Sequence, residues 1–175
     1  MFKSCCTVAV LCVTLCGPAV ADILHVLGDY RTIQAAIDAA MDGDEVEVHP
    51  GIYNEKINLL GKAITVRSSD GPDVTIIDAT GLGQVSVVTC NSGEGPNTVL
   101  DGFTVTGGTG SGMADVGSSP SVANCTFIWN LTYGDGGGMY NLNSSNPTVT
   151  NCILWGQQRW LVRWAERPHR HVQRC

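Results

Sequence analysis

The chain repeats one pattern, GMADVGSSPSVANCTF at residues 112–127 and GMYNLNSSNPTVTNCIL at residues 138–154. Met113 recurs as Met139, 26 residues later, and Cys125 recurs as Cys152, 27 residues later, after one inserted residue, Asn146. Self-similarity at a period of 20–50 residues is typical of stacked repeats, in which each unit buries its apolar face against its neighbours. The chain is therefore expected to contain a repeat architecture.

Each copy consists of short apolar segments that alternate with polar residues and are interrupted by Ser-Ser-Pro or Ser-Asn-Pro. Neither copy has room for a helical pattern of ten residues, and alternation with a period of two predicts strands. Strands that recur once per repeat, with similar residues in register, favour parallel pairing from coil to coil. We therefore predict an all-β fold, a right-handed parallel β-helix, over residues 22–156.

The two aligned cysteines allow a more specific prediction about the core. Cys125 and Cys152 are expected to stack in successive coils about 4.8 Å apart, the spacing of neighbouring strands. Their side chains then point the same way, which disfavours a disulfide. We expect two reduced, buried thiols beside a ladder of Asn124 and Asn151.

The first 21 residues have the features of a secretory signal peptide. A basic start at Lys3 precedes an uncharged apolar run over residues 4–20, and Ala19 and Ala21 provide small residues at the cleavage position. The run is short for a membrane span. We expect cleavage after Ala21, no transmembrane segment in the mature chain, and a secreted or cell-surface location.

Charge is distributed unevenly along the chain. Residues 22–158 hold four basic and fifteen acidic residues, whereas the segment after them holds five arginines and one glutamate. An acidic body argues against nucleic acid as a partner and against tight capture of polyanionic sugars. The segment 157–175 lacks glycine and departs from the coil pattern. It is expected to be an aberrant basic tail that leaves the edge of the last coil, residues 149–154, unpaired. The alternative is a basic arm that docks on the acidic body or on an anionic surface.

One amphipathic helix is expected near the start of the mature chain, after a short strand over residues 23–27. Apolar residues recur with helical spacing over residues 33–41, Thr32 is a suitable N-cap, and Gly43 is expected to end the helix. A strand over residues 45–49 follows. The apolar face of this helix is expected to cover the first coil, which has no neighbour on one side.

Three further motifs resemble a known group of folds. GDYRTIQ at residues 28–34, PGIYNE at residues 50–55 and GKAITVRS at residues 61–68 resemble the opening of pectinesterase-like β-helix proteins of the pectin-lyase-like superfamily. FIWN at residues 127–130 and GGGM at residues 136–139 resemble the repeats of polymorphic outer-membrane proteins. These resemblances imply a right-handed β-helix but not a particular activity.

The resemblance to pectinesterases does not extend to their catalytic motifs. Sequences similar to QDTL, DFIFG and LGRPW, which provide the aspartates, glutamine and arginine of that family, do not occur in this chain. A polysaccharide lyase needs a basic residue, and the candidates are Lys56, Lys62 and Arg67. The available glutamines lie outside any matching motif: Gln84, Gln157 and Gln158. We assign no catalytic residue, and an enzyme of the pectinesterase or lyase type remains the alternative.

Possible metal ligands are present without a regular spacing. Residues 42–45 (Asp-Gly-Asp-Glu) contain carboxylates but not the twelve-residue pattern of a calcium loop, so a helix stop and turn is favoured. The glycine-rich segments 107–110 and 134–138 are expected to be turns. His25 and His49 lie in expected strands without a ligand partner at a set spacing. No metal and no cofactor is assigned.

The aromatic residues Trp129, Tyr133 and Tyr140 are candidates for stacking on sugar rings. Together with the absent catalytic motifs, they favour an exported β-helix with a structural or adhesive role. The expected partner is a polysaccharide or another cell-surface component, bound weakly.

Overall fold

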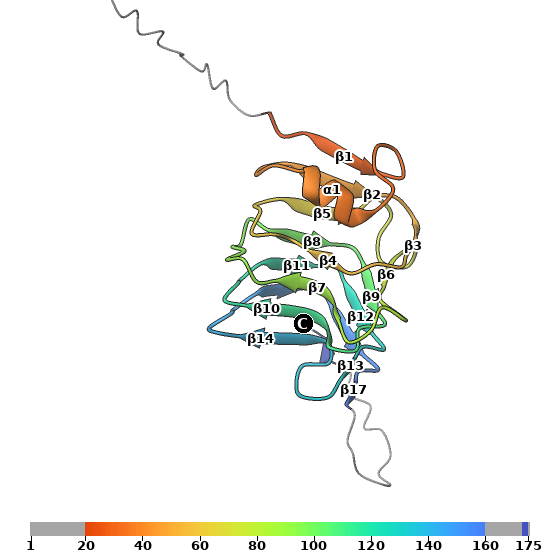
Figure 1. The fold of residues 1–175 in the computed structure, drawn as a ribbon, viewed down its shortest axis with the longest axis vertical. Coiled ribbons are helices and arrows are strands. Elements are labelled where there is room, and N and C mark those ends of the chain that lie inside the picture. Colours follow the sequence, from red (N-terminus) through yellow and green to blue (C-terminus); the bar gives the residue numbers. More distant parts are fainter. Residues whose placement is uncertain (1–19, 160–172, 175) are drawn as a thin grey trace, which may run out of the picture.

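The computed structural model describes residues 20–159 and 173–174, which form a parallel β-solenoid of about 5 turns with one short helix (Figure 1). The predicted all-β, parallel β-helix class is confirmed. Strands from consecutive coils pair in parallel and in register, which places residues 20 to 34 positions apart beside one another. The expected signal-peptide residues 1–19 and most of the tail lie outside the described residues.

Three sheets run along the solenoid. Sheet A contains β1 (Ile23–Val26), β2 (Glu45–Val48), β5 (Thr65–Ser68), β8 (Val99–Asp101), β11 (Ser121–Ala123) and β15 (Thr148–Thr150). Sheet B contains β3 (Gly51–Tyr53), β6 (Thr75–Asp78), β9 (Thr104–Thr106), β12 (Thr126–Ile128), β16 (Ile153–Trp155) and β18 (Gln173–Arg174). Sheet C contains β4 (Ile57–Asn58), β7 (Ser86–Cys90), β10 (Ser111–Val116) and β14 (Met139–Leu142). A separate pair joins β13 (Leu131–Thr132) to β17 (Gln158–Arg159).

The core is a set of columns, because every second residue of a strand points inward and strands stack in register. In sheet A one column runs through five buried side chains: Leu24, Val46, Val66, Leu100 and Val122. The residues between them face outward and are polar in most coils. The alternation of the sequence thus fixes both the core and the chemistry of the outer faces.

The thiol column lies beside the corner that joins sheet A to sheet B. Cys125 and Cys152 are buried and free, and the backbone N–H of Cys125 donates to the Cys152 sulfur at 3.4 Å. Asn151 donates to the Asn124 side chain at 2.7 Å, and Asn124 donates to Asp101 at 2.7 Å. The predicted reduced thiols and asparagine ladder are confirmed, and the ladder extends one coil further to Asp101.

The helix α1 (Ile33–Ala39) lies beside β1 and β2 at the amino-terminal end of the stack (Figure 1). Its buried residues Ile33, Ala36 and Ile37 cover the first coil, as predicted. The Thr32 hydroxyl accepts the N–H of Ala35 at 3.1 Å, which confirms the N-cap.

The end of the helix was predicted incorrectly. The backbone is extended at Ala40, before the expected stop at Gly43, and Met41 is exposed. Two side chains from outside the helix account for this difference. The Lys62 ammonium group donates to three carbonyl groups at the helix end, and the Asp44 carboxylate accepts the N–H of Met41 at 2.7 Å. These bonds satisfy backbone groups that further helical turns would otherwise satisfy.

The other end of the stack also differs from the prediction. Gln158 and Arg159 continue the coil as β17, and β18 pairs antiparallel with β16, placing Arg174 opposite Ile153 and Gln173 opposite Leu154. The prediction that this edge stays unpaired is therefore wrong at Ile153 and Leu154. Antiparallel addition of a late segment covers backbone groups that a further coil would otherwise pair.

Candidate functional site

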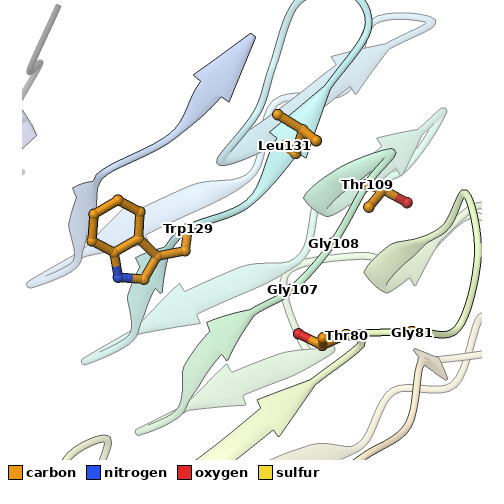
Figure 2. Close-up of a pocket in the computed structure, with 7 residues that line it drawn as sticks. All are labelled: Thr80, Gly81, Gly107, Gly108, Thr109, Trp129 and Leu131. Atoms are coloured by element: carbon orange, nitrogen blue, oxygen red, sulfur yellow. The ribbon is translucent and has the colours of Figure 1, made fainter. Parts of the chain in front are cut away.

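An open hollow of about 290 Å³ lies at the corner between sheet B and sheet C (Figure 2). Its walls come from three successive coils. Two of these coils contribute the glycines Gly81, Gly107 and Gly108, whose lack of a side chain leaves space beside the Trp129 indole of the third coil. The lining residues are Thr80, Gly81, Gly107, Gly108, Thr109, Trp129 and Leu131. The predicted turn at residues 107–110 therefore forms one wall of this hollow.

Trp129 is one of seven non-glycine residues in the described part of the chain that have a positive φ. Its φ is +55°, in the left-handed region, and the corresponding corners of the neighbouring coils carry the glycines Gly107 (φ +75°) and Gly156 (φ +70°). Trp129 is 52% exposed as a residue, and its ring contacts Trp155 edge-on, with ring centroids 4.9 Å apart. A Cβ atom at Gly156 would lie 3.1 Å from the Trp129 ring. The ring is thus fixed by its neighbours while much of its surface faces solvent.

A second hollow, of about 420 Å³, adjoins the first, since Thr109 lines both. Its walls contain both of the tyrosines singled out from the sequence, with relative exposures of 60% at Tyr133 and 37% at Tyr140. The lining residues are Gln84, Thr109, Gly110, Thr132, Tyr133, Gly134, Asp135 and Tyr140. The structure therefore gathers all three aromatic candidates along one stretch of surface, where they lie among threonines and glycines.

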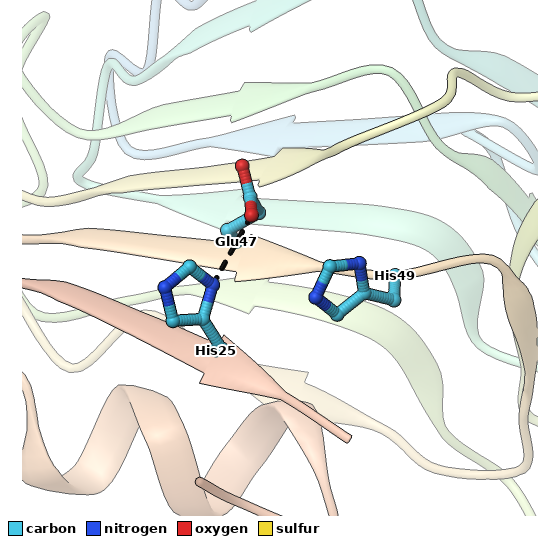
Figure 3. A group of neighbouring side chains, drawn as sticks. All are labelled: His25, Glu47 and His49. Atoms are coloured by element: carbon cyan, nitrogen blue, oxygen red, sulfur yellow. Dashed lines mark hydrogen bonds and ion pairs between the residues drawn. The ribbon is translucent and has the colours of Figure 1, made fainter. Parts of the chain in front are cut away.

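The outer face of sheet A carries a different kind of cluster. His25 on β1 and Glu47 on β2 are register partners, and His49 follows β2 on the same face (Figure 3). The Nδ1 atom of His25 lies 3.1 Å from a carboxylate oxygen of Glu47. Arg67, the next register partner, forms ion pairs with Glu45 and Glu47. The sequence shows no ligand partner for the two histidines at a set spacing, but the fold places both beside Glu47, which lies one coil from His25 and two residues before His49.

Residues 42–45 act as a structural turn. The Asp44 carboxylate is buried and accepts the N–H groups of Asp22 and Met41, and these hydrogen bonds lower the pKa of Asp44 below its usual value. Asp42 accepts the N–H of Ala63 at 2.9 Å. Because backbone amides occupy these carboxylate oxygens, the turn interpretation of this segment holds.

The remaining candidates from the sequence are dispersed. Lys62 binds the end of α1, Arg67 pairs with glutamates, and Lys56 is exposed. The Gln157 side chain donates to the carbonyl group of Phe127 and accepts the N–H of Asn130, so it supports the backbone of the neighbouring coil. Gln84 lines the second hollow, and the side chain of Gln158 lies outside the described residues.

Two buried carboxyl groups inside the solenoid were not singled out from the sequence. Glu94 accepts hydrogen bonds from the N–H groups of Gly61 and Ser92 and from the Ser118 hydroxyl, at 2.7–2.8 Å. Burial by itself raises the pKa of Glu94, but these bonds outweigh it and lower the pKa below its usual value. Asp115 is also fully buried, yet neither of its carboxylate oxygens has a hydrogen-bond partner within the described structure.

No protein-family model and no curated protein matches this chain. Across residues 20–159 and 173–174, no helix is long and apolar enough to cross a membrane. A function for this chain must therefore be inferred from the surfaces described above.

Proposed function

We propose that this protein is an exported β-helix module with a structural or adhesive role, and that it binds a neutral glycan weakly at the hollow beside Trp129. The observation that carries this proposal is the left-handed backbone of an exposed tryptophan. A non-glycine residue in this region costs about 1–2 kcal/mol, and the neighbouring coils avoid that cost with glycine. Retained strain of this kind is characteristic of functional positions.

The surroundings of Trp129 suit a sugar ring. An indole offers a broad apolar face, while the hydroxyl groups of Thr80 and Thr109 border the same hollow. Ligand sites commonly combine an aromatic wall with a few polar groups that fix orientation. The tyrosines of the adjoining hollow extend this surface, which favours an oligosaccharide over a single sugar.

The acidic body narrows the class of glycan. Fifteen acidic residues against four basic ones over residues 22–158 give a negative field that repels polyanionic sugars. Asp135 is the single carboxylate among the described residues that line the two hollows. A neutral glycan is therefore the proposed ligand, and an exported, cell-surface location fits such a partner.

The alternative is a carbohydrate-active enzyme of the pectinesterase or polysaccharide-lyase type. One observation favours it, namely the gathering of ionisable side chains His25, Glu47 and Arg67 on one outer face. However, this face belongs to sheet A, whereas the first aromatic hollow lies at the corner between sheet B and sheet C and the second adjoins it. A binding surface that is separated from the ionisable groups favours recognition over catalysis.

Replacement of Trp129 by glycine separates a binding role from a structural one. Because the change removes the indole but suits the left-handed backbone, we expect the stability to stay within about 1 kcal/mol of the original. Affinity for a neutral oligosaccharide, selected on a glycan array and measured by calorimetry, should fall at least about tenfold, since loss of an aromatic contact is worth about 1.4 kcal/mol or more.

The matched control is Ile52→Ala, which removes another exposed apolar side chain, 72% exposed on sheet B, without touching either hollow. Its affinity should equal that of the unmodified protein. Equal binding by Trp129→Gly, or no binding of any neutral glycan by the unmodified chain, would contradict the proposal.

A further inference from the structure

We propose that His25, Glu47 and His49 form a binding site for a divalent transition-metal ion such as Zn²⁺. One ligand atom from each side chain lies within 4.8 Å of the other two. Glu47 on β2 and His49 just after β2 have a single residue between them, and His25 is supplied by the preceding coil. The site therefore exists only because β1 and β2 pair in this register (Figure 3).

The ligand types match this class of ion. Imidazole nitrogen and carboxylate oxygen bind Zn²⁺ at about 2.0–2.2 Å, so two ligands of a tetrahedral ion lie about 3.3 Å apart. His25 Nδ1 and the Glu47 oxygen are already 3.1 Å apart. A ring nitrogen of His49 lies within 4.8 Å of both atoms. Two histidines with one carboxylate favour Zn²⁺ or Cu²⁺ over Ca²⁺ or Mg²⁺, which prefer oxygen ligands.

Arg67 gives Glu47 the outer support that metal-binding carboxylates usually have. It pairs with the second carboxylate oxygen of Glu47, which leaves the first oxygen directed at His25. The positive charge of Arg67 is shared with Glu45, which lies 2.6 Å from its Nε atom. Outer interactions of this kind orient the ligand and are a regular part of metal sites.

The two imidazoles lie close enough to each other to share one ion. Their rings stack with centroids 5.9 Å apart and 15° between their planes. Within the described part of the chain, no hydrogen bond joins the His49 ring to another residue, so its nitrogens are available to an ion. When the ion binds Nδ1 of His25, the proton on that nitrogen moves to Nε2 or to solvent. All three side chains are partly exposed, which gives an ion access and leaves a coordination position for water.

Calorimetric titration with ZnCl₂ of the mature chain, which begins at Asp22 and is kept reduced, tests the proposal. The tail residues His169, His171 and Cys175 offer competing ligands, so every variant is made in the His169→Ala, His171→Ala, Cys175→Ser background. We expect this background to bind one equivalent of Zn²⁺. His49→Ala and Glu47→Gln should each weaken that binding at least about tenfold. Asp101→Asn, which removes a different carboxylate from sheet A, should leave it unchanged.

A second measurement requires no change to the site. In the same background, Zn²⁺ should shift the ring nitrogen resonances of both His25 and His49 in ¹⁵N spectra at one equivalent. Unshifted resonances, undiminished Zn²⁺ affinity in His49→Ala, or loss of all binding when the three tail residues are replaced would each overturn the proposal. The result for Zn²⁺ binding is independent of the result for glycan binding, because neither His25 nor His49 lines the two hollows.

Discussion

Replacement of Asp115 by asparagine is expected to stabilise the protein at pH 8 by about 4 kcal/mol and to leave its stability at pH 3 nearly unchanged. Burial raises the pKa of Asp115 to about 7; the Cys90 thiol lowers it and the negative charge of Glu94 adds to the increase. Asp115 is fully buried, and no N–H or O–H group within the described structure donates to either carboxylate oxygen, so the weak interaction with the Cys90 thiol offsets little of the cost of ionisation.

The sign of this pH dependence of stability follows from the number of protons that the folded and unfolded chains bind. Below pH 3.8 both the folded and the unfolded chain hold the proton on Asp115, so the carboxyl group is neutral in both. Between pH 3.8 and about 7 only the folded chain holds it, so unfolding releases a proton and stability falls as the pH rises. Above about pH 7 both states are ionised, and the folded state carries the full cost of a buried charge.

Denaturant unfolding of both proteins at pH 3, 5.5 and 8 measures this difference. Asp44→Asn is a control of opposite sign, because hydrogen bonds from Asp22 and Met41 hold the pKa of Asp44 below its usual value. That variant should be destabilised at pH 8 and less so at pH 3. A constant difference between Asp115→Asn and the unmodified protein at all three values would show that Asp115 is not buried in this way.

Gly112→Ala is expected to destabilise the protein by about 3 kcal/mol, the upper end of the usual cost of core overpacking. A Cβ atom there would lie 2.6 Å from the carbonyl oxygen of Gly138 and 2.7 Å from the Asn130 amide nitrogen, both from the following coil. Gly112 therefore allows two coils to approach at strand spacing. The Asn130 nitrogen belongs to a side chain, but the Gly138 oxygen belongs to the backbone and cannot move aside as the end of a flexible side chain can.

Gly134→Ala provides the matched control, since a Cβ atom at Gly134 would meet nothing within 4 Å. Thermal and denaturant unfolding should show that this variant is close to the unmodified protein. Equal stability of Gly112→Ala and Gly134→Ala would mean that residues 112 and 138 do not stack.

Much of the fold was predictable from local patterns. The repeat predicted that Met113 lies beside Met139 and Val122 beside Val149, and both pairs occur in the observed register. A one-residue insertion at Asn146 did not obscure this, because it falls in a turn outside the paired strands. The helix start was equally local, since Thr32 caps it from within the same segment.

The sequence did not predict the end of α1 or the histidine cluster. Both depend on contacts between coils whose sequences are not similar to one another. The end of α1 depends on Lys62, which approaches from the next coil. His25 and Glu47 are 22 residues apart in a region with no recognisable repeat, so no spacing rule predicts their contact. Asp115 had a local signal, because a period of two places it on the same inward face as Met113. Charged residues are expected on the surface, and an aspartate on the inward face conflicts with that expectation. The alternating pattern alone therefore did not identify Asp115 as buried.

Hydrogen-bond scalar couplings in an isotope-labelled sample test the stacking of the coils most directly. Both proposed sites depend on this register, since it brings Trp129 beside Gly156 and His25 beside Glu47. We predict couplings from the N–H of Ile153 to the carbonyl group of Cys125 and from the N–H of Glu45 to the carbonyl group of Asp22, whose N–O distances are both 2.9 Å. Couplings that instead connect neighbouring strands of the sequence as antiparallel hairpins would contradict the parallel solenoid and both sites built on it.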